Sequence, residues 1–226
     1  MSLRFEGPDG PFEMTPIRCL VAGWTGRDPA KVAHHIEELA AIGVAPPSTT
    51  PLYYRVPASL ASQQPAYEVL SGETGGEAEP VILDDGARLW LTLGSDHTDR
   101  GLEAASVAHS KAVCPKPLAT GAWALDDVAA RLDGLVLTSE ISTDGHGWDL
   151  YQEDSLAAML PLAELASGAP GARAGMLGAG TVLFCGTVPA KGGVRPTPFF
   201  RARLSDPGTG REIALAYHIT ELPVIA

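Results

Sequence analysis

The segment from residue 77 to residue 93 constrains the fold of this chain more than any other. Glu77-Ala78-Glu79-Pro80-Val81-Ile82-Leu83 leads into the turn sequence Asp84-Asp85-Gly86, and an apolar run resumes at Leu89-Trp90-Leu91-Thr92-Leu93. Two apolar runs separated by a short turn that contains Asp and Gly predict a β-hairpin. The chain is therefore expected to contain antiparallel sheet.

Short helical and strand-like segments alternate along the rest of the chain. Asp28 followed by Pro29 predicts a helix start, because Asp caps free N–H groups and Pro suits the first turn, and this helix is expected to end near Gly43. Five prolines between residues 46 and 65 predict extended chain with one strand. Further helices are expected at residues 100–110, 125–132 and 155–167, where Ser155 is the expected cap, and further strands at residues 17–22, 181–185, 199–204 and 213–219.

Size and composition point to one folded domain in a reducing compartment. The chain has 226 residues, 45% of them hydrophobic, which is enough for one sizeable core. Its net charge of −11 and the lack of a Lys and Arg cluster argue against nucleic-acid binding. Three widely separated cysteines form no disulfide framework, so a cytoplasmic location is expected. No signal peptide or membrane-spanning segment is evident, since the most apolar helical stretch, 156–166, contains Pro161 and Glu164.

Acidic residues flank the predicted hairpin. Glu77 and Glu79 are two positions apart, so in a strand both carboxylates point to the same side of the sheet. Two like charges at that distance repel, and a divalent cation relieves the repulsion; oxygen ligands suit Mg²⁺, Mn²⁺ or Ca²⁺. Asp96 or Asp99, which follow the second strand, would supply the third carboxylate. Taken alone, this spacing is more typical of a solvated strand face.

Five segments occur in an order that characterises one superfamily. They are His35-Ile36-Glu37-Glu38, Leu52-Tyr53-Tyr54-Arg55-Val56-Pro57, Glu77-Ala78-Glu79 with Gly94-Ser95-Asp96-His97-Thr98-Asp99-Arg100, Gln152-Glu153-Asp154-Ser155, and Gly180-Thr181-Val182-Leu183-Phe184-Cys185-Gly186-Thr187. In this order they resemble the motifs of the fumarylacetoacetate hydrolase (FAH) superfamily. Arg55 stands where relatives have Lys, Gly101 where they have an acid and Val188 where many have Pro, so the chain resembles a divergent bacterial branch.

The resemblance implies a fold and a set of site residues. The fold would be α+β, a mixed but mostly antiparallel β-roll with short peripheral helices, forming a homodimer. Residues 1–226 would make one catalytic domain, with 1–65 as an N-terminal lid or extension and 66–226 as the roll. Residues Glu77, Glu79 and Asp96 would hold Mg²⁺ or Mn²⁺, with Ca²⁺ also suited.

Further roles follow from the same resemblance. His35, oriented by Glu38, would activate a water as general base; His34 points nearly to the opposite side of the predicted helix. Lys111 would pair with the substrate's carboxylate or an intermediate, although its spacing is shorter than usual and Lys116 could substitute. Substrate contacts would come from Arg55, Arg100, Gln152 and Thr187.

The implied activity is hydrolysis of a C–C bond in a small 2-oxo acid of the acylpyruvate type, with the metal stabilising the enolate. A 2-oxo acid decarboxylase, hydratase or isomerase on the same metal site is the alternative enzyme. A non-catalytic dimer that binds a metal–ligand complex is the alternative outside catalysis.

Overall fold

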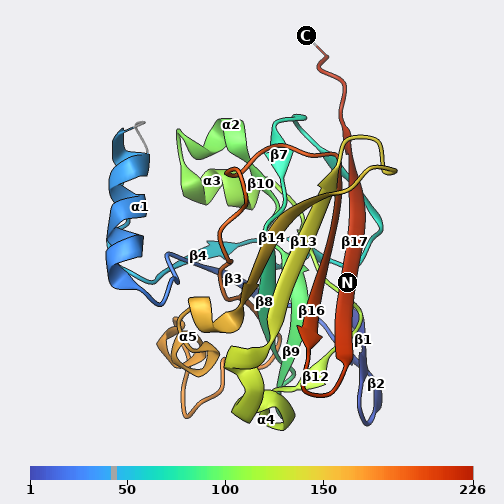
Figure 1. Cartoon of the computed structure of the whole chain (residues 1–226). Coiled ribbons are helices and arrows are strands. Elements are labelled where there is room, and N and C mark those ends of the chain that lie inside the picture. Colours follow the sequence, from blue (N-terminus) through green and yellow to red (C-terminus); the bar gives the residue numbers. More distant parts are fainter. Residues whose placement is uncertain (42–44, 226) are drawn as a thin grey trace.

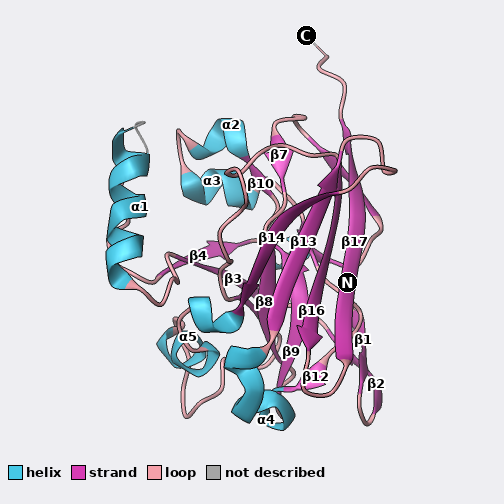
Figure 2. Ribbon diagram, in the orientation of Figure 1, coloured by secondary structure: helices cyan, strands magenta, loops and turns pink. Residues whose placement is uncertain are grey.

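Two packed sheets with short helices at their edges make up the chain (Figures 1 and 2). The computed structural model describes residues 1–41 and 45–225. The helices are α1 (Pro29–Ala41), α2 (Arg100–Glu103), α3 (Val107–Ala112), α4 (Leu125–Val128) and α5 (Leu162–Gly168), with 3₁₀ turns at Ala58–Leu60, Ala129–Gly134 and Leu156–Ala158. The strands, most of which pair in antiparallel, contain more residues than the helices. The predicted α+β class is therefore confirmed.

A six-stranded sheet forms the central layer. Its strands, in spatial order, are β12 (Trp123–Ala124), β9 (Leu89–Ser95), β8 (Ala78–Asp84), β15 (Thr181–Phe184), β3 (Arg18–Gly23) and β4 (Leu52–Val56). Only β15 and β3 pair in parallel; the other neighbours are antiparallel. The strands β8 and β9 form the predicted hairpin, with Ala78 opposite Ser95. Within residues 1–65, β3 and β4 are part of this central layer.

A five-stranded sheet packs on one face of the central layer. Its order is β14 (Asp149–Ser155), β13 (Val136–Ser142), β16 (Phe199–Asp206), β17 (Arg211–Glu221) and β6 (Ala66–Val69), and only β17 and β6 are parallel. Two-stranded pairs complete the fold: β1 (Leu3–Gly7) with β2 (Gly10–Met14), β5 (Ala61–Ser62) with β11 (Lys116–Pro117), and β7 (Thr74–Gly75) with β10 (Thr98–Asp99). Burial alternates strictly along the middle of β17, as expected for a strand with one face toward the core.

The central sheet is buried on both faces, which explains its sequence. Side chains such as Ile82 point into the core between the two sheets, whereas Val81 and Leu83 point into a second core that includes Leu3 and Phe5 of the β1–β2 hairpin. Every residue of β8 is buried as a result. A strand covered on both sides needs an almost continuous apolar sequence, and polar residues in it require partners. The buried carboxyl group of Glu79, in this strand, therefore needs a hydrogen-bond or ionic partner.

The predicted helix at 155–167 is wrong in its first part. Ser155 ends β14 and its side chain makes no capping hydrogen bond, because residues 149–155 pair with β13. The helix α5 starts only after Pro161, which has no N–H to continue a preceding helix. The helical pattern at 100–110 likewise divides into α2 and α3, since Ser106 caps a new helix by accepting from the backbone N–H of His109.

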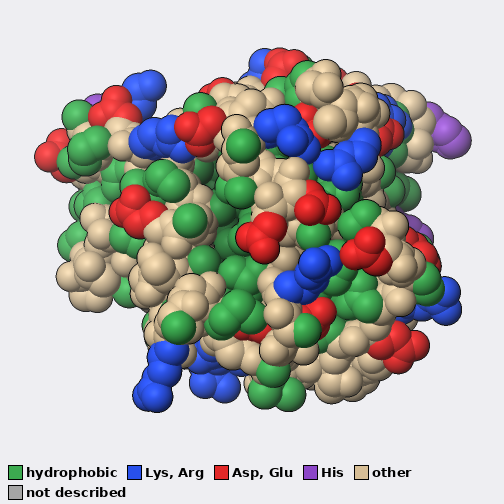
Figure 3. Space-filling model, turned by 90° about the horizontal axis from the view of Figure 1, so that it is seen from below, with side chains coloured by type: hydrophobic (Ala, Val, Ile, Leu, Met, Phe, Trp, Pro, Cys, Tyr) green, Lys and Arg blue, Asp and Glu red, His purple; other side chains and the backbone are tan. Residues whose placement is uncertain are grey.

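Three further points concern the end of the first helix, membrane-spanning helices and the charge on the surface. The expected end of the first helix near Gly43 lies outside the described residues. Among the residues that are described, no helix is long and apolar enough to cross a bilayer. On the face shown in Figure 3, acidic and basic side chains are interspersed.

Candidate functional site

The acidic residues meet where the β8–β9 hairpin opens. The backbone N–H of Asp96 donates to the carbonyl of Glu77 over 2.9 Å, which holds the residues just outside the hairpin together. Glu79 lies on the same side of β8 as Val81, and its Oε2 accepts from the backbone N–H of Gly186 at 2.8 Å. Glu79 is 3% exposed and Asp96 is 1% exposed. Two carboxylates are thus buried at one end of the most buried strand.

Two lysines are buried against Asp96. The ammonium of Lys111, on α3, pairs with Asp96 Oδ2, and that of Lys116 lies 3.3 Å from Oδ1. Lys116 is fully buried and donates to the carbonyls of His97, at 2.7 Å, and of Lys111, at 2.6 Å. Asp96 Oδ1 accepts no hydrogen bond from any described group. Lys116 ties the chain around Asp96 together, whereas Lys111 contributes its charge.

Burial and neighbouring charge shift the ionisation of these groups in different directions. Burial, and then the charge of Asp96, raises the pKa of Glu79 well above its ordinary value. Burial would also raise the pKa of Asp96, but Lys111 and Lys116 outweigh it and hold that pKa below its ordinary value. Burial would lower the pKa of Lys111, but Asp96 and Glu77 raise it. Among the described residues Glu79 forms no ion pair, although the charge of Lys111 partly offsets the rise in its pKa.

Arg100 closes the outer side of the cluster. Its Nη2 donates to Glu77 Oε2 at 3.0 Å, and its Nη1 donates to Glu103 Oε2 at 2.9 Å. The side chains of Arg100 and Glu77 are only 10% and 16% exposed. Asp99, the competing metal-ligand candidate, instead accepts from the backbone N–H of Leu102 and caps α2.

A buried polar chain lies under the 95–99 loop. The hydroxyl of Tyr217 lies 2.9 Å from both Ser95 Oγ and His97 Nδ1, while His97 Nε2 has no hydrogen-bond partner among the described groups. Burial, with the charges of Lys116 and Arg100, lowers the pKa of His97 to about 3, so its imidazole is neutral. A Cβ at position 76 would lie 2.3 Å from the Tyr217 hydroxyl, which explains the glycine there.

Gln152 and Thr187, predicted to bind substrate, are engaged with each other and with the backbone. Gln152 Oε1 accepts from the N–H of Ala78 at 2.8 Å and from Ser139 Oγ at 2.7 Å. Its Nε2 donates to Thr187 Oγ1 at 2.6 Å and to the carbonyl of Val188 at 2.8 Å. The amide thus has all its hydrogen-bonding positions filled. It joins β14 to Ala78 at the start of β8 and to Thr187 and Val188. These two residues follow Gly186, whose N–H donates to Glu79.

Other predicted residues are placed differently. Arg55 is an exposed residue of β4, and the alternation of a strand puts it on the face opposite Tyr54. The Tyr54 ring lies on the cluster side, with its centroid 5.8 Å from Lys111 Nζ. The structure therefore does not bring Arg55 to the acidic cluster. The side chains of His35 and Glu38 lie outside the described part of the chain, although α1 stands on the same side of the molecule as α2 and α3 (Figure 1).

Tyr54 and Lys116 are the contributors that sequence reasoning did not rank first. Tyr54 belongs to the segment noted for Arg55, and strand alternation alone would have offered either side chain to the site. Lys116 precedes Pro117 in a two-residue strand whose position depends on pairing with residues 61–62. No local pattern reveals such a pairing.

The described residues contain no group of three or more His, Cys, Asp and Glu side chains arranged to hold a metal ion as it stands. The carboxylates of Glu77, Glu79 and Asp96 are neighbours, but each is already directed to a partner: Arg100, the Gly186 N–H and the two lysines, respectively. A cation at this cluster would have to displace at least one of these partners.

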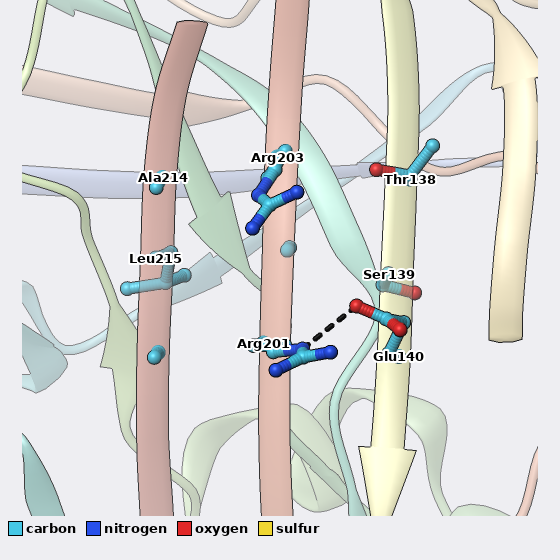
Figure 4. A pocket seen from close by; sticks show the side chains of 9 residues that line it. Thr138, Ser139, Glu140, Arg201, Arg203, Ala214 and Leu215 are labelled. Atoms are coloured by element: carbon cyan, nitrogen blue, oxygen red, sulfur yellow. Dashed lines mark hydrogen bonds and ion pairs between the residues drawn. The ribbon is translucent and has the colours of Figure 1, made fainter. Parts of the chain in front are cut away.

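A separate hollow of about 330 Å³ lies on the outer face of the five-stranded sheet (Figure 4). It is lined by Thr138, Glu140, Arg201, Arg203 and Ala214, among others. Arg201 donates from Nε to Glu140 Oε2 at 2.7 Å. The five-stranded sheet and the inner core separate this hollow from the acidic cluster, so it plays no part in that site.

Comparison with known proteins supports the fold. The family model described as Protein of unknown function (DUF2848) matches residues 22–217, whereas no curated protein matches the sequence. The solved structure of Cg1458 has a TM-score of 0.65 at 14% identity, covering 98% of this chain and 99% of that one. A 2-keto-3-deoxy-D-arabinonate dehydratase complexed with magnesium and 2,5-dioxopentanoate has a TM-score of 0.62 at 17% identity, covering 92% and 74%. The 4-oxalocrotonate decarboxylase from Pseudomonas putida G7, complexed with calcium and acetate, has a TM-score of 0.55 at 16% identity, covering 89% and 76%. The resemblance to the FAH superfamily is thereby confirmed at the level of the fold.

Proposed function

Since this chain belongs to the family described as Protein of unknown function (DUF2848) and has the FAH fold, we propose that it is a divalent-metal-dependent enzyme acting on a small 2-oxo acid. The observation that carries the proposal is the pair of buried carboxylates, Glu79 and Asp96, at the open end of the β8–β9 hairpin. A structural role alone does not require two carboxylates buried so close that one raises the pKa of the other.

The donor set fits a hard divalent cation. Carboxylate oxygens are the ligands that Mg²⁺ and Mn²⁺ prefer, and Ca²⁺ accepts the same set. Asp96 Oδ1 is buried and accepts no hydrogen bond, although Lys116 Nζ lies 3.3 Å from it, so the Asp96 carboxylate has a lone pair to offer a cation once Lys111 moves away. In this proposal Glu77, Glu79 and Asp96 hold the ion. When bound, the ion would supply Lewis-acid stabilisation of the enolate form of a 2-oxo acid.

The chain's own residues position the cluster. The N–H of Gly186 fixes one oxygen of Glu79, and Arg100 fixes Glu77. Gln152 and Thr187 act as positioning residues, because they anchor the backbone of Ala78 beside Glu79. Lys111 is 7% exposed and carries the ammonium best placed for a carboxylate of the substrate.

The class of substrate rests on chemistry that two similar structures share. One holds magnesium with 2,5-dioxopentanoate, and the other is a decarboxylase that holds calcium with acetate. Both pair a hard cation with an oxygen-rich ligand, which is what the carboxylate cluster with its adjacent ammonium suits.

Two finer activities remain as proposals on this site. The first is hydrolysis of a C–C bond in an acylpyruvate-like acid, with water activated by His35 and oriented by Glu38 on α1. The second is decarboxylation, hydration or isomerisation, which needs no such base, and the named dehydratase and decarboxylase favour it. We also propose that the protein is a cytoplasmic homodimer. Light scattering of the purified protein tests whether it is a dimer.

Isothermal titration of Mn²⁺, with oxalate as an enolate mimic, tests the metal site. Glu79→Gln keeps an oxygen for the Gly186 N–H but removes the charge, so we expect loss of stoichiometric Mn²⁺ binding. Glu153→Gln, at an exposed position, is the matched control and should bind as the parent does. Equal binding by the parent and Glu79→Gln would remove this cluster from consideration as the metal site.

Assays of the metal-loaded protein on acylpyruvates, oxaloacetate and 2-keto-3-deoxy acids then separate the two activities. Loss of acylpyruvate cleavage in His35→Ala, with metal binding intact, is the result expected for hydrolysis. Turnover of a 2-oxo acid that survives this substitution would favour the decarboxylase, hydratase or isomerase.

A further inference from the structure

Lys111 is placed so that it shares Asp96 with any cation bound there. Its ammonium pairs with Asp96 Oδ2, and its side chain is 9% exposed. The short helix α3 carries it, held at its start by Ser106 and packed beside β4. The lysine is thus a built part of the cluster and not a mobile surface side chain.

A divalent cation at Asp96 and the Lys111 ammonium in its present position are in conflict. Both require lone pairs of the same small carboxylate, and two positive charges a few ångströms apart repel strongly in a site that excludes water. Asp96 cannot turn both oxygens to the ion, since Lys116 lies 3.3 Å from Oδ1 and is itself fixed by backbone carbonyls. The partner that has to move is therefore Lys111, whose ammonium stands on a flexible four-carbon stem and is not fixed by backbone carbonyls as Lys116 is.

Two features offer the displaced ammonium another position. The ring of Tyr54 lies with its centroid 5.8 Å from Lys111 Nζ, within the range of a cation–π interaction. An anionic ligand bound beside the cation would supply a second carboxylate. The ring retains the ammonium near the cluster, and the ligand compensates its charge.

We infer that Lys111 competes with the divalent cation for Asp96 and so couples metal binding to the binding of an anionic ligand. This inference rests on the proposed metal site. Metal alone must displace the ammonium from Asp96 without compensation, and it binds weakly. With an anionic ligand present, the ammonium exchanges one carboxylate for another, and metal binds more tightly.

Titrations of Mn²⁺ with and without oxalate, on the parent and on Lys111→Met, test the coupling. In the parent, oxalate should strengthen Mn²⁺ binding markedly. In Lys111→Met, Mn²⁺ alone should bind about tenfold more tightly than to the parent, and the strengthening by oxalate should fall by about the same factor, as expected for a coupling of ordinary size. Lys191→Met, at an exposed ion pair, is the matched control and should behave as the parent.

Each outcome separates this inference from the proposed function. If Mn²⁺ alone binds Lys111→Met no more tightly than the parent, or oxalate strengthens binding equally in both, the competition is overturned while the metal site stands. If no protein binds Mn²⁺ with or without oxalate, the metal site and the inference fail together. Should Lys111→Met not fold, Lys111→Gln gives the same comparison, because it also removes the charge that competes with the cation for Asp96.

Discussion

Replacing Gln152 with Leu should destabilise the whole protein, because its side-chain amide is a structural clamp. The residue is completely buried in β14 and makes four hydrogen bonds, two as acceptor and two as donor. Leu keeps most of the volume and none of these bonds. The backbone N–H of Ala78 loses its Gln152 partner, and the carbonyl of Val188 keeps only a long contact of 3.4 Å with Thr187.

The expected cost follows from these two backbone groups. A buried polar group left without its partner costs about 1–3 kcal/mol, so the two together cost about 2–6 kcal/mol. A domain of this kind has a total stability of about 5–15 kcal/mol, so the loss would be a large fraction of it. An exposed neighbour, Glu153, forms a surface ion pair with Lys191, and Glu153→Gln should cost less than about 1 kcal/mol.

Urea unfolding followed by tryptophan fluorescence measures both variants. A midpoint shift in Gln152→Leu that corresponds to less than about 1 kcal/mol would refute the clamp. A small shift of that kind together with a large loss of ligand affinity would instead support the substrate-binding role that the sequence suggested.

Three other substitutions test local features of the fold. Asp85→Asn should lower stability at neutral pH, because hydrogen bonds hold the pKa of Asp85 below its ordinary value despite burial. The stabilisation by the Asp85 carboxylate is therefore present above about pH 4 and is lost as the pH falls through the folded pKa. Denaturation curves of the two proteins should converge in acid. Gly76→Ala should cost about 1–3 kcal/mol in thermal unfolding, because the new methyl group would meet the Tyr217 hydroxyl, whereas Gly134→Ala, where nothing lies within 4 Å, should be nearly neutral. Asp28→Ala removes the cap that accepts two backbone N–H groups at the start of α1, and it should cost about 1 kcal/mol, measured by circular dichroism during urea unfolding.

The parts of the fold that sequence predicts well depend on local chemistry. The Asp84-Asp85-Gly86 turn and the apolar run of β8 define their hairpin without reference to the rest of the chain. The start of α1 is equally local, since Asp28 caps it. The C-terminal hairpin of β16 and β17 follows in the same way from the turn sequence Asp206-Pro207-Gly208-Thr209-Gly210.

The parts that sequence missed depend on distant partners. The strands β13 and β14 are rich in Ser, Thr, Glu and Asp, and they form strands because β13 pairs with β16 and β14 pairs with β13. The parallel pair of β15 with β3 joins Thr181 to Arg18, and no local signal specifies that register. The β1–β2 hairpin likewise owes its buried Phe5 to a core formed by other segments.

The site shows the same division. The spacing of Glu77 and Glu79 and the position of Asp96 after the second strand made these carboxylates candidates, but only the resemblance to the superfamily favoured them over a solvated strand face. Their cationic partners were harder to rank, because the burial of Lys111 and Lys116 depends on how α3 and the 113–117 segment fold back on Asp96. Arg55 shows the limit of a motif match, because the match could not tell which face of β4 it occupies.

The hydrogen bond from the N–H of Gly186 to Glu79 spans 107 positions in the chain. The strand β15, which pairs with β8, ends two residues before Gly186. During synthesis the hairpin leaves the ribosome about a hundred residues before the strand that completes it, at roughly 5–20 residues per second. In that interval β8 has one unpaired edge along an apolar run, a form that invites association with other chains. Nascent chains that stop short of residue 181 should therefore depend on chaperones, and the acidic cluster should gain its native ionisation only when the last quarter of the protein has been made.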